Sequence, residues 1–262
     1  MSATTSPDNT ARPGLRVARS LALVALTVGI LVLAWQLIVV ALRIPPYLVP
    51  PPGPVAHAFV VNIKVIATQT GFTLTAAALG LTLSTLLATG IALAFSMSRN
   101  IAQASLPVVI AFRSTPVAAV APLAMLFLGR GIATSMAVVT IVSFFPLLVN
   151  LMRGLAGADR NAAELMHVYG ASRWQQLRYV RIPYALPFLF TGMRIAASSA
   201  ILGAMLSEWI TGSKGLGNLI LDSGEMRETE LLWAAVVTSV TIAMSVFWLT
   251  SAGEKRFVHW RA

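Results

Sequence analysis

Residues 65–98 read VIATQTGFTLTAAALGLTLSTLLATGIALAFSMS, a run of 34 uncharged residues between Lys64 and Arg99. A membrane-spanning helix needs about 20 mostly apolar residues, because each residue advances about 1.5 Å and the hydrocarbon core is about 30 Å thick. In lipid, the backbone groups of a single segment can only be satisfied as a helix. The run therefore predicts a transmembrane helix.

Similar windows recur along the chain. Uncharged windows of 22 or 23 residues lie between Arg19 and Arg43, between Arg130 and Arg153, and between Glu230 and Glu254. Two more apolar segments, at about 101–129 and 184–207, contain one arginine each, Arg113 and Arg194. The composition, 57% hydrophobic and only 11% charged, lies outside the range of soluble domains. We therefore expect an all-α polytopic membrane protein with about six transmembrane helices.

The distribution of Lys and Arg predicts the orientation of these spans. With the N terminus inside, the inner segments hold twelve of these residues and the outer segments hold five. Both termini should then be cytoplasmic, with residues 1–18 as a disordered tail and 19–262 as the membrane domain. The net charge of +10 reflects this topology and attraction to anionic lipids rather than nucleic-acid binding.

Two further features constrain the organisation. Residues 43–54, RIPPYLVPPPGP, contain six prolines, which predict a stiff external connection without regular helix. The chain has no cysteine, which excludes disulfides, thiolate catalysis and cysteine-based metal sites. Small residues also recur along the second span, from Gly71 through Gly80 to Ala92, as is typical of closely packed membrane helices.

The loop 154–183 interrupts the apolar pattern. Residues 159–187 read DRNAAELMHVYGASRWQQLRYVRIPYALP. Alanines, Glu164 and Met166 favour a short helix, which Gly170 can end in the left-handed conformation. Residues 172–183 favour a second, interfacial helix, and Pro183 and Pro187 are expected to mark the turn into the fifth span. By periodicity alone, an ordinary amphipathic cytoplasmic loop explains the same pattern.

The spacing of Glu164, Gly170 and Pro183 resembles the motif of binding-protein-dependent ABC importer permeases. That motif reads Glu-Ala-Ala, three residues, Gly, nine residues, Ile, any residue, Leu, Pro. Leu165 and Met166 stand where the family usually has alanines. The segments FRSTPVAAVAPLAMLFLG (112–129), PFLFTGMRIA (187–196) and EWITGSKGLG (208–217) resemble the branch that serves nitrate, taurine, alkanesulfonates, bicarbonate and heterocyclic vitamin precursors.

The resemblance implies the type I importer architecture, with a cytoplasmic coupling helix that docks on a separate ATPase. The coupling residues it implies are Ala163, Glu164, Leu165, Met166, Gly170, Ala171, Arg173 and Pro183. Implied partners are two ATPase copies, an extracytoplasmic substrate-binding protein and a second permease copy, as a homodimer or a heterodimer. The implied location is the bacterial cytoplasmic membrane. No cofactor is expected in this chain, because ATP and Mg²⁺ would belong to the ATPase.

Candidate pathway residues are polar groups at membrane depth. An arginine inside a span costs about 2.5–3.5 kcal/mol on insertion scales and should face the bundle interior or a polar cavity. The hypothesis is a cationic, hydroxyl-bearing lining that favours anionic or polar solutes; the alternative is an arginine that snorkels to the interface. The candidates are Arg113, Ser114, Thr115, Pro116, Arg194 and Glu208.

Other functions find less support in the residues. The chain has no G-x-x-x-x-G-K-[ST] phosphate loop, so ATP hydrolysis would require a partner. Its three histidines are far apart, and no paired carboxylates fall within a span, which disfavours a membrane enzyme. An ATP-independent channel or carrier would be expected to hold a carboxylate well inside a span. Every Asp and Glu falls in a predicted loop or at a span end.

Overall fold

The computed structural model describes residues 13–97, 116–158 and 160–257. Every regular element within these ranges is helical. The long helices are α1 (Pro13–Ala41), α3 (Ile63–Met97), α6 (Ile132–Ala156), α9 (Ile182–Thr211) and α11 (Thr229–Phe257). The shorter ones are α2 (Pro52–Val61), α5 (Val117–Leu128), α7 (Arg160–Val168), α8 (Arg173–Gln176) and α10 (Leu216–Glu225), with a π-helical segment at Leu177–Arg181.

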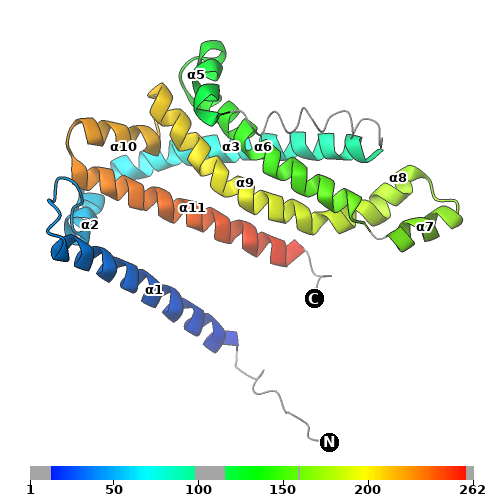
Figure 1. Ribbon diagram of the computed structural model, residues 1–262, viewed down its shortest axis with the longest axis horizontal. Coiled ribbons are helices and arrows are strands. Elements are labelled where there is room, and N and C mark those ends of the chain that lie inside the picture. The colour runs from blue at the N-terminus through cyan, green and yellow to red at the C-terminus, as the bar shows by residue number, and fades with distance from the viewer. Residues whose placement is uncertain (1–12, 98–115, 159, 258–262) are drawn as a thin grey trace, which may run out of the picture.

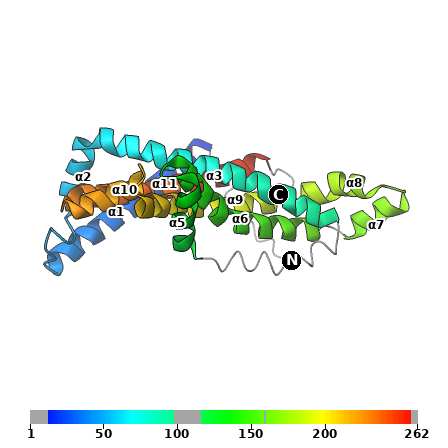
Figure 2. The same cartoon turned by 90° about the horizontal axis from the view of Figure 1, so that it is seen from above.

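The bundle is elongated. Helices α3, α6, α9 and α11 run along its length, with α7 and α8 at one end and α2 and α10 at the other (Figure 1). Helix α1 diverges from the bundle at the α2 end, and α5 projects from its side (Figures 1 and 2). Among the described side chains of α1, Val39 is buried while nearly all others face outward, as expected for a helix that faces lipid.

Five helices in the described ranges are long and apolar enough to cross a membrane: Ala22–Ala41, Ile63–Met97, Ile132–Ala156, Arg173–Thr211 and Thr229–Glu254. They coincide with five of the six predicted spans, and the all-α expectation is confirmed. The remaining predicted span, at about 101–129, lies partly outside the described residues. Its described part is α5, an apolar helix of 12 residues that is too short to span alone.

Small residues set the distance between the central helices. Ala76, Gly80, Ser84, Ala88 and Ala92, spaced by four, are all buried along one face of α3. A Cβ on Gly80 would lie 2.6 Å from the Cβ of Val139 on α6, so only glycine permits this contact. The predicted packing role of the small residues is therefore confirmed from Ala76 to Ala92, whereas Gly71 is exposed.

The prediction that residues 43–54 lack regular helix is wrong, because helix α2 starts at Pro52, inside that stretch. Helix α1 likewise starts at a proline, Pro13. Proline is tolerated in the first turn because the backbone N–H that it lacks has no intrahelical partner there. A cluster of prolines therefore limits where a helix can continue, not where it can start.

The predicted turn at Pro183 and Pro187 is also wrong. The chain continues as one helical run from Arg173 to Thr211. Before Pro183 the helix widens, and the Ile182 N–H bonds to the Leu177 carbonyl oxygen, five residues earlier. Proline has no backbone N–H to donate. A π-helical turn, in which each N–H bonds to the carbonyl oxygen five residues earlier, allows the helix to continue through such a residue. Pro187 lies buried inside α9.

Candidate functional site

The predicted coupling loop forms a helical elbow at one end of the bundle (Figure 1). Helix α7 ends at Val168, and Gly170 follows with a φ of +75°. The Ala171 N–H donates to the Met166 carbonyl oxygen at 2.9 Å, which is the long-range bond of a Schellman motif. The left-handed conformation predicted for Gly170 is confirmed.

Helix α8 begins directly after this stop. The Ser172 side chain accepts from the Gln175 N–H at 3.3 Å, and the Gln175 Oε1 accepts from the Ser172 N–H at 2.7 Å. This reciprocal pair is a capping box, which satisfies two backbone donors at the start of the second helix. The angle between α7 and α8 is thus set by hydrogen bonds made within residues 165–176.

The elbow exposes several large apolar side chains. Val168 and Tyr169 are each 82% exposed, and Leu165 is 59% exposed. Glu164 lies on the same short helix and is exposed. Large apolar side chains that lie exposed close together often mark a site where a partner binds.

The other implied coupling residues occupy different environments. Met166 and Ala171 are half-buried, Arg173 is exposed, and the side chain of Ala163 lies outside the described residues. Pro183 is half-buried within the helical run that leads into α9. The structure therefore brings Glu164, Leu165, Met166, Gly170, Ala171 and Arg173 together at the elbow and places Pro183 nearer the bundle.

The elbow is joined to the bundle through the π-helical segment. Leu177 is buried and packs with Leu151 and Leu155 of α6 and Ala185 of α9. The Arg181 Nη1 donates to the Ser96 carbonyl oxygen near the end of α3, at 3.2 Å. Residues 172–183 thus do not form a separate interfacial helix, because one side of this segment is buried against α3, α6 and α9.

At the opposite end, Glu208 lies in the last turn of α9 and is only 1% exposed. Its Oε2 accepts from the Thr73 hydroxyl of α3 at 2.9 Å and from the Gly217 N–H at 3.0 Å. The Thr73 hydroxyl oxygen in turn accepts from the Leu216 N–H at 2.9 Å. Two free amides at the start of α10 are thereby satisfied by side chains from α3 and α9.

The glycines of residues 212–217 permit this close junction. A Cβ on Gly215, whose φ is +152°, would overlap the Glu208 carboxylate, and one on Gly217 would overlap the Met205 carbonyl oxygen. Residues 208–218 are mostly helical. Residues 208–211 end α9, and α10 starts at Leu216.

A cavity of about 420 Å³ opens beside this junction. Its lining includes the Glu208 carboxylate, the cationic side chains of Arg130 and Lys214, and the Phe72 ring. The Lys214 Nζ lies 5.6 Å from the centroid of that ring. The Oε1 of Glu208 is buried and has no hydrogen-bond partner among the described residues. Two basic residues thus border the cavity, whereas the Oε1 of Glu208 is enclosed by the protein.

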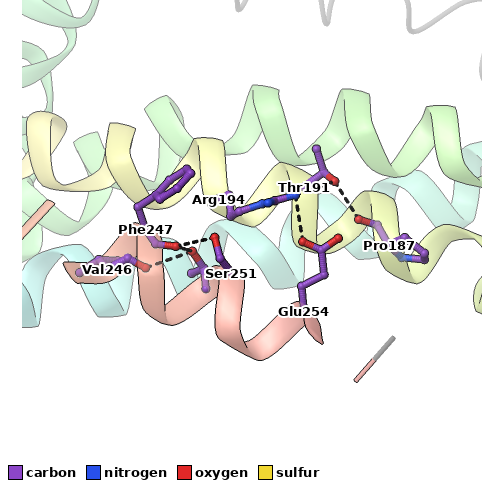
Figure 3. Close-up of polar contacts among 8 residues, drawn as sticks. Pro187, Thr191, Arg194, Val246, Phe247, Ser251 and Glu254 are labelled. Atoms are coloured by element: carbon purple, nitrogen blue, oxygen red, sulfur yellow. Dashed lines mark hydrogen bonds and ion pairs between the residues drawn. The ribbon is translucent and has the colours of Figure 1, made fainter. Parts of the chain in front are cut away.

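The pathway candidates Arg194 and Pro116, which the structure describes, do not line this cavity. Arg194 lies in the first half of α9, and its Nη2 pairs with Glu254 Oε2 of α11 at 2.9 Å (Figure 3). The Arg194 Nη2 is also 3.5 Å from the Thr191 hydroxyl oxygen. Pro116 precedes α5 and is exposed. Arg113, Ser114 and Thr115 lie outside the described residues.

The sequence did not single out Thr73 at the junction or Arg130 at the cavity. Thr73 lies in a span rich in hydroxyl residues, so nothing in its local sequence distinguishes it from Thr75 or Thr82, which bond only to their own helix. Arg130 was counted only for topology, although it borders the cavity. Among the described residues, no cluster of three His, Cys, Asp or Glu side chains could hold a metal ion.

The fold and the two sites describe a multi-pass helical membrane protein with an exposed helical elbow at one end and a polar junction at the other. Residues 86–259 match the family described as "Binding-protein-dependent transport system inner membrane component". The chain belongs to this family. It is the permease component of a binding-protein-dependent ABC importer, an inner-membrane protein of a family that has no ATPase of its own.

Curated relatives support this assignment over most of the chain. The riboflavin transport system permease protein RibX of Chloroflexus aurantiacus is 33% identical, over 90% of this chain and 89% of that protein. A probable ABC transporter permease protein of Haemophilus influenzae is 31% identical, over 89% and 95%. The taurine transport system permease protein TauC of Escherichia coli is 24% identical, over 89% and 88%. The named solutes differ among these relatives.

Solved structures share the fold. An inward-facing structure of the MetNI methionine ABC transporter aligns with a TM-score of 0.65 at 16% identity, over 76% of this chain and 96% of that chain. An amino acid ABC transporter crystallised with histidines aligns with a TM-score of 0.64 at 19% identity, over 76% and 97%. At these identities the likeness extends to the fold alone.

Proposed function

We propose that this permease imports a small polar or anionic solute, such as a sulfonate, nitrate or a related compound, and that the α7–α8 elbow couples this transport to a separate ATPase. The observation that carries the proposal is the elbow itself. It is a helix of outward-facing apolar side chains, ended by Gly170 and fixed in angle by a capping box. An amphipathic helix of this kind fits a hydrophobic groove on a partner.

The elbow is also built to transmit force. Its second helix continues without a break into α9, and the buried Leu177 and the Arg181–Ser96 contact tie the same segment to α6 and α3. A displacement of α7 by an ATPase would therefore move the starts and ends of several spans together. When packed helices move as rigid bodies, binding at one end can produce a hinge or shear motion of the whole group.

The proposed assembly is a type I importer. It has six spans, of which the third in chain order comprises about 101–129, and both termini are in the cytoplasm. Two permease copies, most simply a homodimer, would line the pathway and bind two ATPase copies, while an extracytoplasmic protein delivers the solute. This topology is supported by the excess of Lys and Arg in the segments that share a side with the elbow.

The solute class is supported by charge. Arg130 and Lys214 line the cavity at the end of the bundle opposite the elbow. Exposed bases at such a mouth raise the local concentration of anions. Taurine and aliphatic sulfonates are named in relatives of 24% and 27% identity, and riboflavin in one of 33% identity.

Glu164→Lys tests the coupling role. Because Glu164 is exposed, the substitution should leave the fold intact while reducing copurification of the cognate ATPase about tenfold or more. Glu228→Lys is the matched control, since Glu228 is also exposed but follows α10 at the opposite end. Normal ATPase association and normal solute-stimulated hydrolysis in Glu164→Lys would contradict the coupling role.

A further inference from the structure

We infer that helix α3 carries a displacement of the elbow to the α10 end of the bundle, and that Arg181 and Thr73 are the positioning residues that connect α3 at its two ends. The inference rests on the proposed function, because it takes the elbow as the part that the ATPase moves. It adds a route across the bundle and assigns roles to two residues outside the docking surface.

Arg181 forms the contact at the elbow end of α3. Its Nη1 donates to the carbonyl oxygen of Ser96, one residue before the end of α3, at 3.2 Å. Arg181 is half-buried, whereas Arg173 and Arg178 of the same helical run are exposed. Among the described residues, no carboxylate lies within ion-pair distance of Arg181. A hydrogen bond from a charged donor is stronger than one from a neutral donor, so this contact holds the π-helical segment to α3.

Thr73 forms the contact at the opposite end of α3. Its buried hydroxyl donates to Glu208 Oε2 of α9 at 2.9 Å and accepts from the Leu216 N–H of α10 at 2.9 Å. The competing bond within α3, to the Gln69 carbonyl oxygen, is longer, at 3.3 Å. One side chain therefore joins α3 to both α9 and α10.

Helix α3 is the less interrupted of the two helices that connect these ends (Figure 1). Thr73 and Ser96 lie about six turns apart, which is roughly 35 Å of helix. Between Ile63 and Met97 the chain has no proline, whereas the run that contains α9 includes a π-helical turn and the buried Pro187. Prolines and π-helical turns are the usual places where helices bend. A displacement at Arg181 should therefore reach Thr73 as the movement of one stiff element.

Packing supports the same route. Buried alanines of α3 share one hydrophobic cluster with Ala185 and Ala196 of α9, and others share a second cluster with Ala200 and Ala204. The two helices are thus packed together between the contacts as well as bonded at both ends. Packed helices that are joined in this way shift as a group rather than bend independently.

A spin label at the α10 end tests the inference on the permease–ATPase complex in lipid nanodiscs. The chain has no cysteine, so Met226→Cys provides a single label, at a side chain that is 72% exposed and follows α10 directly. Trapping the ATPase with ADP and vanadate should change the spectrum of this label. No change would overturn the inference while leaving the coupling role intact. Failure of the ATPase to copurify with the unaltered permease would instead reject the proposed function.

Variants of Arg181 locate the effect at the elbow end. Arg181→Ala should leave ATPase copurification unchanged and reduce the spectral change at Met226→Cys about threefold or more, because the link to α3 is lost. Arg181→Lys should restore most of the change, since an ammonium group can also donate to a carbonyl oxygen. Arg178→Ala is the matched control, because Arg178 is exposed and lies beside the Tyr179 ring of its own segment. A full response in Arg181→Ala, or an equal loss in Arg178→Ala, would contradict the inference.

Thr73→Val removes the contact at the other end with almost the same side-chain shape, and it should give a similar loss. Its control is Thr75→Val, because Thr75 is exposed and bonds to the Gly71 carbonyl oxygen of its own helix. Since both contacts act through α3, combining Thr73→Val with Arg181→Ala should reduce the response little further than the larger single loss. Losses that multiply would show two independent effects and reject the route. Thermal unfolding identifies any variant that does not fold, and the Arg181 series is decisive without Thr73→Val.

Discussion

At the α7–α8 end of the bundle, large apolar side chains face outward, whereas at the α10 end a carboxylate, a hydroxyl and two backbone amides are buried together. The first end is shaped by hydrogen bonds between residues close in sequence, within 165–176. The second end depends on Thr73, Glu208 and Gly217, which lie far apart in sequence.

The difference separates two requirements on a transport subunit. A surface that receives a partner has to be accessible and preformed, and local turn chemistry achieves this at little cost in stability. A buried polar junction has to satisfy each of its groups with a specific donor or acceptor. Substitutions at the α10 end should therefore reduce stability, whereas those at the elbow should reduce association with the ATPase.

The largest expected effect is on stability at Gly217. A Cβ there would overlap the Met205 carbonyl oxygen, so Gly217→Ala forces α10 away from α9 and should cost about 3 kcal/mol. The measurement is detergent-solubilised thermal unfolding. Gly90→Ala is the control, because a Cβ at Gly90 meets nothing within 4 Å and alanine favours the helix. Equal stability of the two variants would contradict the close junction.

A somewhat smaller loss is expected for Glu208→Ala. It leaves the Gly217 N–H without its acceptor and leaves the Thr73 hydroxyl only the longer bond of 3.3 Å to the Gln69 carbonyl oxygen, and it should cost about 2 kcal/mol. Glu208→Gln should cost less, because an amide oxygen can still accept both bonds. If the alanine variant unfolds at the wild-type temperature, the buried hydrogen bonds do not hold α10 as the structure implies.

At the elbow, Gly170→Ala should cost about 1 kcal/mol of local strain, because Gly170 has a φ of +75° but open space around the position of a Cβ. Global unfolding should be almost unchanged, and ATPase association should fall about fivefold. Gly170→Asn should be milder, since asparagine tolerates the left-handed conformation. Gly71→Ala, with open space and no positive φ, should have no effect on association.

The smallest effect is expected at the ion pair between Arg194 and Glu254, whose side chains are 30% and 21% exposed. A double-mutant cycle with Arg194→Ala and Glu254→Ala should give a coupling of about 0.5 kcal/mol. Solute uptake should change little if Arg194 only joins α9 to α11. A large uptake defect in Arg194→Ala, with normal stability, would instead support a role in the pathway.

The sequence was informative where the signal is local. Charge-free windows located four spans, an apolar segment with one arginine located a fifth, and the offset of Gly170 from Glu164 located the helix stop, because these signals depend on neighbouring residues. Pro183 was misjudged, since a π-helical turn can accommodate proline within a continuous helix. Thr73 could not be identified, because its role depends on α9 and α10 reaching it from over 130 residues away.

The most direct test of the account asks on which side of the membrane the elbow lies and whether the ATPase covers it. The chain has no cysteine, so Leu165→Cys provides a single label on the native background, at a side chain that is 59% exposed. A membrane-impermeant maleimide should label inside-out vesicles but not right-side-out ones, and bound ATPase should block the labelling. Labelling of right-side-out vesicles, or labelling unaffected by the ATPase, would contradict the account.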